Sequence, residues 1–142
     1  MRYDPVVHAQ FRHTTREVVI HNKVVPERAG ILLYLGAGNR DERAFKDPDT
    51  FDINRDDLHM GRENRSGRYK DGKNGHLGFG IGQHFSRGYA MARQESAIAC
   101  KMLMQGVKNI RPKFSEHPGI TAPSIDSGGF RAPAELWLEL DR

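Results

Sequence analysis

The sequence has little of several kinds of residue. Its 142 residues include one cysteine, Cys100, and one tryptophan, and only 37% are hydrophobic. A single cysteine excludes an internal disulfide framework and is typical of a reducing compartment. The longest apolar run, AGILLYLGAG at 29–38, is too short to cross a bilayer, and MRYDPVVHAQ at the start lacks the apolar core of a secretory signal. These absences predict a soluble cytoplasmic protein without membrane contact.

The charge is only mildly unbalanced. The chain carries 22 Lys and Arg against 18 Asp and Glu, a net charge of +4. Such a bias permits an acidic protein partner but does not indicate nucleic acid binding. The segment GRENRSGRYKDGKNG, 61–75, concentrates cations, which are Arg62, Arg65, Arg68, Lys70 and Lys73. We favour a solvated surface loop there, with docking of an acidic partner as the alternative.

Two segments have the periodicity of regular structure. Residues 16–35 predict a β-hairpin or small sheet: REVVI forms a strand, HNK a turn with Asn22 in the left-handed conformation, and GILLYL a strand buried on both faces. Residues 89–107 predict the single good helix, which Asn109 and Pro112 terminate. Its apolar stripe comprises Ile98, Ala99, Met102, Leu103 and Val107, and Cys100 is predicted to be a small packing residue in it. AELWLEL near the end is a last strand.

Residues 36–87 have little periodicity of either kind. About fifty residues without regular structure are abnormal for a compact domain. Such a stretch needs a cofactor, a partner or the rest of a larger protein to wrap around.

Several familiar motifs are incomplete. LGAGNRD lacks the third glycine of a dinucleotide-binding loop, and no helix pattern follows it. The seven histidines are scattered without paired cysteines, which argues against a zinc site. Ser86 near His84 hints at a hydrolase, but a nucleophile elbow needs glycine two residues before the serine, where His84 stands.

A resemblance explains the glycine-rich loop. FGIGQHFSRG resembles the haem-binding loop of the cytochrome P450 family, Phe-x-x-Gly-x-Arg/His-x-Cys-x-Gly, with Phe79, Gly82, His84 and Gly88 at the family's spacing. Three further blocks are similar to the family in the same order. They are RYDPVVHAQFRHTTREVVI, LLYLGAGNRDERAFKDPDTFDINRD and ARQESAIA.

The resemblance implies an α+β fold, the C-terminal part of the cytochrome P450 fold, as one truncated domain over 1–142. It would hold a small antiparallel sheet, a long meander, one long helix and a terminal strand pair. The implied cofactor is haem. Its site residues would be Phe79, Gly82, His84, Ser86, Gly88 and Arg12, with Ser86 at the metal position and with His84 and Arg12 on the propionates.

The departures from the family pattern concern the chemistry. The family's iron ligand is a cysteine thiolate, which favours O–O cleavage, and Ser86 stands in its place. Arg87 replaces an apolar residue. Arg2 matches the arginine of the family's Glu-x-x-Arg, whose Glu falls before Met1 and would pair with Arg2 and Arg55. We expect the isolated chain to be marginally folded.

Three functions remain open at this stage. The first is a monooxygenase, or its haem-binding part, that is impaired or inactive because the thiolate ligand and most of the fold are missing. The second is a non-catalytic interaction or activator module, and the third is a gene remnant. The partner implied is an acidic ferredoxin-type redox protein or another protein chain.

Overall fold

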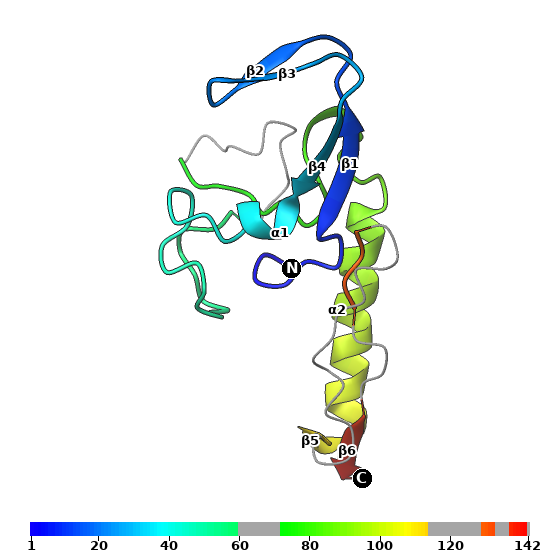
Figure 1. Ribbon diagram of the computed structural model, residues 1–142. Helices are drawn as coiled ribbons and strands as arrows, with labels where there is room; N and C mark the ends of the chain where they lie inside the picture. Colours follow the sequence, from blue (N-terminus) through cyan, green and yellow to red (C-terminus); the bar gives the residue numbers. More distant parts are fainter. Residues whose placement is uncertain (60–71, 114–128, 133–136, 142) are drawn as a thin grey trace.

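The computed structural model describes residues 1–59, 72–113, 129–132 and 137–141. β1 and β4 form a ribbon that rises from α1, and the β2–β3 hairpin continues it (Figure 1). The elements in chain order are β1 (Ala9–His13), β2 (Val18–Ile20), β3 (Lys23–Val25), β4 (Gly30–Tyr34), α1 (Leu35–Gly38), η1 (Gly82–His84), α2 (Tyr89–Gly106), β5 (Lys108–Pro112) and β6 (Leu138–Asp141).

The β2–β3 hairpin has the turn that the sequence predicts. His21 and Asn22 have φ of 48° and 63°, and Ile20 stands opposite Lys23. A two-residue turn with both central residues left-handed matches the twist of the flanking strands. The Thr14 hydroxyl closes the base of the hairpin by donating to the Pro26 carbonyl at 2.6 Å.

The strand predicted at GILLYL, which is β4, differs from its prediction in pairing and burial. β4 pairs antiparallel with β1, a strand that the periodicity did not indicate, with Ala9 opposite Tyr34. The prediction that GILLYL is buried on both faces is wrong, since Leu32, Leu33 and Tyr34 are 39%, 42% and 51% exposed. The physical reason is that, among the described residues, only β1 pairs with β4, and Leu32, Leu33 and Tyr34 are left uncovered.

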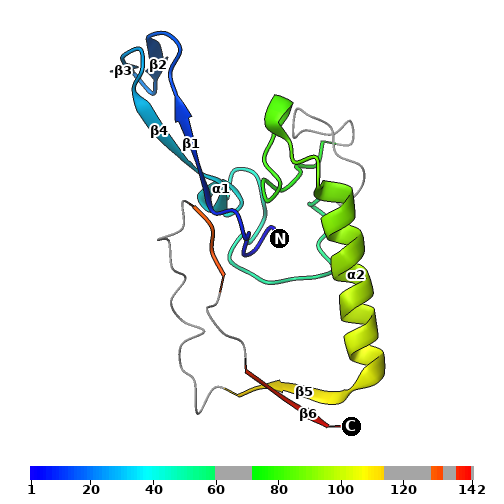
Figure 2. The ribbon, with the colours of Figure 1, turned by 90° about the vertical axis from the view of Figure 1, so that its right-hand side faces the viewer.

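The helix forms where it is predicted, but it does not pack as predicted. α2 ends at Gly106, one residue early, and every residue from 94 to 106 is exposed. Ile98 and Met102 are 50% and 67% exposed, and Cys100 is exposed rather than a packing residue. Figure 2 shows α2 standing apart from the β1–β4 ribbon, with β5 and β6 at its far end. Those two strands pair antiparallel and form the predicted terminal strand pair.

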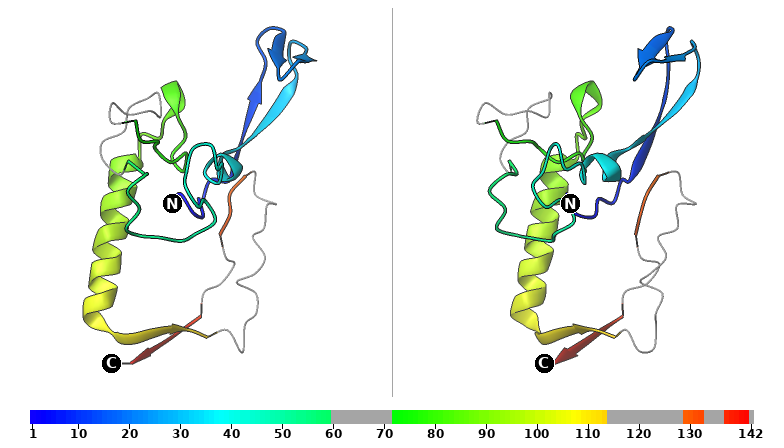
Figure 3. Two further views of the ribbon diagram at one scale, coloured as in Figure 1. Left: turned by 90° about the vertical axis from the view of Figure 1, so that its left-hand side faces the viewer. Right: turned by 60° about the vertical axis from the view of Figure 1, so that its left-hand side comes forward.

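The core is correspondingly small. In the described part of the chain the buried hydrophobic residues are Ala9, Leu35 and Phe45. They lie where the ribbon meets α1 and the irregular segment that follows it, the region near the N-terminus in both views of Figure 3. Within 36–87 the described residues form only α1 and η1, so the predicted irregular meander is confirmed for them. None of the described helices has the length and apolarity that a membrane span requires.

Candidate functional site

The glycine-rich loop at 78–88 closes on itself through the backbone. The Gly80 amide donates to the Leu77 carbonyl at 2.8 Å, and the Ser86 amide donates to the Phe79 carbonyl at 3.0 Å. Gly80 and Gly82 have φ of 75° and 76°, in the left-handed region that residues with a Cβ rarely adopt. These two glycines are therefore what permits the chain to fold back so that Ser86 returns beside Phe79.

Three aromatic rings fasten the loop to the start of α2. Phe79 lies 5.1 Å from Tyr89 in an edge-to-face arrangement, and Phe85 lies 5.4 Å from Tyr89, both between ring centroids. Phe79 and Phe85 are 6.4 Å apart. Such pairs are each worth about 0.5–1.5 kcal/mol beyond their area burial. Sequence reasoning singled out only Phe79; an aromatic residue three or four positions after Phe85 was the signal for Tyr89.

Ser86 lies at the N-terminus of α2. Gly88 is the N-cap, the Tyr89 amide lies 3.4 Å from the Ser86 carbonyl, and the Ala92 amide donates to the Gly88 carbonyl at 2.9 Å. Ser86 is half-buried, whereas Arg87 is exposed. The positive end of the helix dipole therefore stands next to Ser86, a position that stabilises negative charge.

The predicted propionate contacts come from two different elements. Arg12 lies on β1, half-buried, and its guanidinium donates to the Gln10 side-chain oxygen at 2.9 Å and the Phe11 carbonyl at 2.8 Å. His84 is exposed at the end of η1. Gln10, which sequence reasoning missed, reaches the loop: its amide nitrogen is 3.7 Å from where a Cβ on Gly80 would stand. β1 thus brings Gln10 to the loop and holds Arg12 through it.

Arg2, the residue expected to match the Glu-x-x-Arg arginine, has a defined place. Arg2 is 5% exposed, and its guanidinium donates to the carbonyls of Asn39, Pro48 and Thr50 at 2.7, 2.8 and 3.2 Å. The pKa of Arg2 is lowered by burial and then by the charge of Arg55. Arg2 therefore organises the meander through backbone carbonyls.

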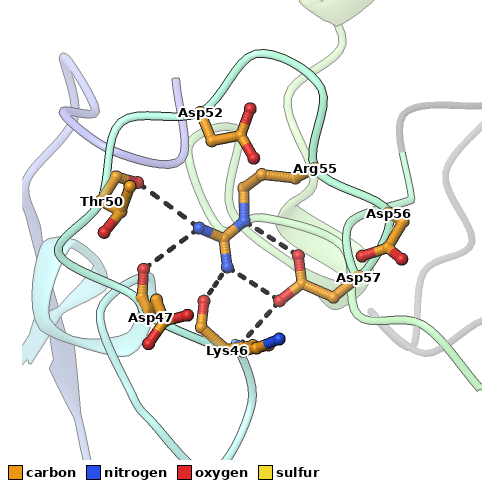
Figure 4. A pocket seen from close by; sticks show the side chains of 7 residues that line it. All are labelled: Lys46, Asp47, Thr50, Asp52, Arg55, Asp56 and Asp57. Atoms are coloured by element: carbon orange, nitrogen blue, oxygen red, sulfur yellow. Dashed lines mark hydrogen bonds and ion pairs between the residues drawn. The ribbon is translucent and has the colours of Figure 1, made fainter.

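Arg55 lines a small acidic pocket in the same meander. The pocket has a volume of about 160 Å³ and is lined by Lys46, Asp47, Thr50, Asp52, Arg55, Asp56 and Asp57 (Figure 4). The Arg55 guanidinium forms two bonds of 2.8–2.9 Å to the Asp57 carboxylate and also donates to the carbonyls of Lys46, Asp47 and Thr50. The Thr50 carbonyl thus serves Arg2 and Arg55 together. Because its donors are taken up by these contacts, Arg55 acts as a structural clamp, and the hydrogen bond from Arg55 lowers the pKa of Asp57.

The role proposed for the cation-rich loop stays a prediction. Of the cation-rich loop at 61–75, Arg62, Arg65, Arg68 and Lys70 lie outside the described residues, and Lys73 is exposed. Across the described ranges no group of three or more His, Cys, Asp or Glu side chains is placed to hold a metal ion.

Comparison with known proteins gives a consistent result. The family described as Cytochrome P450 matches residues 1–121. Cytochrome P450 107B1 of Saccharopolyspora erythraea is 38% identical over 112 residues, which are 78% of this chain and 24% of that protein. Cyclomarin C epoxidase CymV of Salinispora arenicola is 33% identical over 136 residues, 96% of this chain and 29% of that protein.

The fold agrees with the sequence. The structure of cytochrome P450 CYP109Q5 from Chondromyces apiculatus superposes with a TM-score of 0.77 at 31% identity, covering 99% of this chain and 31% of that one. This chain therefore spans less than a third of the length of each of these three relatives. The agreement covers the ribbon, the meander, the glycine-rich loop and the helix in one order, and the chain belongs to the cytochrome P450 family.

Proposed function

We propose that this chain forms the haem-cradling part of a cytochrome P450-type protein in which a serine, Ser86, stands where the family has its iron ligand. The family consists of haem-dependent monooxygenases. The observation that carries the proposal is the closure of the loop, in which the Ser86 amide bonds to the Phe79 carbonyl just before the N-terminus of α2. A side chain at this point lies beside the positive end of a helix, where an anionic iron ligand is stabilised.

The backbone of the loop fits a flat macrocycle. A Cβ at Gly82 would meet nothing within 4 Å, so this surface of the loop is open. Phe79 would shield the ligand side from water, and Arg12 with His84 would face the propionates. Bound haem would supply redox chemistry at iron.

The side chain at the ligand position fits the family's haem chemistry less well than the backbone of the loop does. A serine hydroxyl is neutral at ordinary pH and cannot donate electron density as a thiolate does. Cys100 cannot replace it, because it lies on the exposed surface of α2, fourteen residues further along the chain. The glycine-rich loop thus fits weak haem binding, and the residues present do not suit thiolate-assisted oxygen activation. We propose that the chain by itself is inactive as a monooxygenase.

The exposed surface supports a second element of the proposal, a requirement for further polypeptide. Among the described residues, only Ala9, Leu35 and Phe45 are buried hydrophobic side chains. Apolar side chains are instead exposed along α2, where Met102 and Met104 are 67% and 74% exposed. We propose that the domain over 1–142 is incomplete and packs against the portion of a cytochrome P450 that it does not match, or against another protein chain. An interaction module would expose such a surface as well.

A small partner protein is the other proposed contact. One relative of known structure, P450BioI, was solved in complex with an acylated acyl carrier protein. For this chain the candidate is a small acidic ferredoxin-type protein, attracted by the cations of 61–75. Binding that survives neutralisation of all five cations would exclude this role for the loop.

The axial position is tested by haem titration of the purified chain. We expect weak binding without the red-shifted reduced-carbonyl absorption of thiolate haem, and we expect Ser86→Cys to shift the spectrum toward the thiolate type. Ser96→Cys is the matched control, since it adds a cysteine on an exposed turn of α2. A thiolate spectrum from the unmodified chain would refute the assignment of Ser86.

A chimaera separates ligand chemistry from stability. The 112-residue segment of this chain that matches cytochrome P450 107B1 replaces its counterpart in that protein, so that the rest of that protein supplies the missing packing. We expect the chimaera with Ser86 to lack the thiolate spectrum and the chimaera with Ser86→Cys to gain it. Absence of haem from both would favour the remnant interpretation.

A further inference from the structure

Among the residues that the structure describes, one polar side chain is buried completely. Asn39 is 0% exposed and follows α1 as its C-cap. Its side-chain oxygen accepts a hydrogen bond from the Leu77 amide at 2.7 Å, across 38 residues of sequence. Its carbonyl accepts from Arg2 at 2.7 Å, and its amide donates to Leu35 at 3.0 Å. A single residue therefore joins the N-terminal segment, α1 and the chain that enters the glycine-rich loop.

Leu77 is the last residue before that loop, and it is held at two points. Its amide is bonded to Asn39, and its side chain packs on Gly38, where a Cβ would stand 2.7 Å from a Leu77 methyl carbon. Its carbonyl then accepts the Gly80 amide in the turn that begins the loop. The position of Leu77 therefore fixes where Phe79 emerges, and the Phe79 carbonyl in turn fixes the Ser86 amide at 3.0 Å.

We propose that Asn39 is the positioning residue of the 78–88 loop: its side-chain oxygen sets the place of Leu77 and, through the Leu77–Gly80 turn, the places of Phe79 and Ser86. The proposal extends the proposed function, and its relevance to haem binding rests on that function. Its geometry concerns the polypeptide alone and is testable without cofactor.

The side chain of Asn39 suits an acceptor role. Its Nδ2 has no hydrogen-bond partner in the structure, so the bond to Leu77 is the side chain's one polar contact among the described residues. Replacement by leucine removes this unpaired donor together with the acceptor at similar volume, and only the Leu77 amide loses a partner. Aspartate keeps an oxygen acceptor at the same place. Comparison of the two variants therefore distinguishes the loss of the hydrogen-bond acceptor from a change in side-chain volume.

The test is amide hydrogen exchange on the whole of this chain, residues 1–142, without haem. In Asn39→Leu we expect exchange at Leu77 to accelerate about fivefold or more, the equivalent of about 1 kcal/mol for one hydrogen bond. The Gly80 and Ser86 amides should accelerate with it, while the β1–β4 amides stay unchanged. Asn39→Asp should retain protection at Leu77.

A matched control exists in the same meander. The Asn74 side chain donates to the Ala44 carbonyl at 2.8 Å, so Asn74→Leu removes a comparable long-range bond that does not touch Leu77. It should leave Leu77, Gly80 and Ser86 at their original rates. Four results would overturn the proposal: no protection of Leu77 in the unmodified chain, no acceleration in Asn39→Leu, equal acceleration of β1–β4, or an aspartate variant that behaves like leucine.

A second readout distinguishes the proposal from the proposed function. In the Ser86→Cys background, Asn39→Leu should weaken or broaden the thiolate spectrum, and Asn39→Asp should preserve it. If the exchange pattern appears as expected but no variant binds haem, the positioning role stands and the proposed function fails. If haem binds and Asn39→Leu changes neither spectrum nor exchange, the positioning role fails alone.

Discussion

Replacing Arg2 by methionine is the perturbation that the structure predicts to be most damaging to the meander. Methionine has comparable length and no hydrogen-bond donor. Arg2 is 5% exposed and donates to three carbonyls, those of Asn39, Pro48 and Thr50. In Arg2→Met the Thr50 carbonyl keeps its longer contact from Arg55 at 3.4 Å, whereas Asn39 and Pro48 lose a donor.

The expected loss of stability in Arg2→Met follows from two opposing effects. Hydrogen bonds from a charged donor contribute about 1.5–3 kcal/mol each, and burial of the guanidinium opposes them. Taking about 1 kcal/mol net for each of three bonds gives a loss of about 3 kcal/mol, a factor of about 100 in the opening equilibrium of the meander. Because the described core contains only three buried hydrophobic residues, little packing is present to compensate.

Hydrogen exchange at the Ala44, Phe45 and Thr50 amides measures this opening, since each is bonded within a turn of the meander. Arg28→Met is the matched control, because the Arg28 side chain is 88% exposed and stands 3.6 Å from Glu27 in an ion pair of the kind worth about 0–1 kcal/mol. Arg2→Lys should be intermediate, since one ammonium cannot reproduce the fork of the guanidinium. Unchanged exchange in Arg2→Met, or an equal effect of Arg28→Met, would refute the reasoning.

Three further predictions concern the meander, the helix and the loop. The hydrogen bond from Arg55 lowers the pKa of Asp57 below its ordinary 3.8. The Asp57 carboxylate therefore stabilises the meander above pH 3.8, and this stabilisation is lost as the pH falls through the lowered pKa. An acid titration of hydrogen-exchange protection at the Thr50 amide should show the loss, and Asp57→Asn should abolish this pH dependence. Cys100 should react with a thiol reagent in native buffer about as fast as in urea, and strong protection in the isolated chain would contradict the exposure of α2. Phe79→Leu removes the ring contacts to Phe85 and Tyr89 and should destabilise the loop by about 1–3 kcal/mol, measured by hydrogen exchange at the Ser86 amide. Phe51→Leu changes a ring that is 71% exposed and should leave exchange at the Ser86 amide unchanged.

Local signals in the sequence were sufficient for several parts of the fold. The residues HN between two β-branched runs predict a tight turn, and both adopt positive φ. The apolar spacing after Gly88 predicts a helix, and it forms as α2 because helical hydrogen bonds close within four residues. The glycines of 78–88 predict a sharply folded loop, and two of them have the left-handed backbone that only glycine adopts at low cost.

Other features depend on residues that are distant in sequence. β1 exists as a strand because β4 pairs with it, and nothing in AQFRH alone indicates that pairing. The exposure of Cys100 and Ile98 was predicted wrongly, because an apolar stripe states what a helix is able to bury and not whether a neighbour is present to cover it.

The family and the glycine-rich loop could be recognised from the sequence alone, because motif spacing is a local property, and the identity of residue 86 led to the proposal that Ser86 stands in the family's ligand position. What holds that loop in place became visible only in the folded chain. Arg2 meets Asn39 across 37 residues, and Asn39 meets Leu77 across 38 more. Such contacts leave no periodicity in the sequence, since they arise from the folding of the whole meander and are specified by no neighbour along the chain.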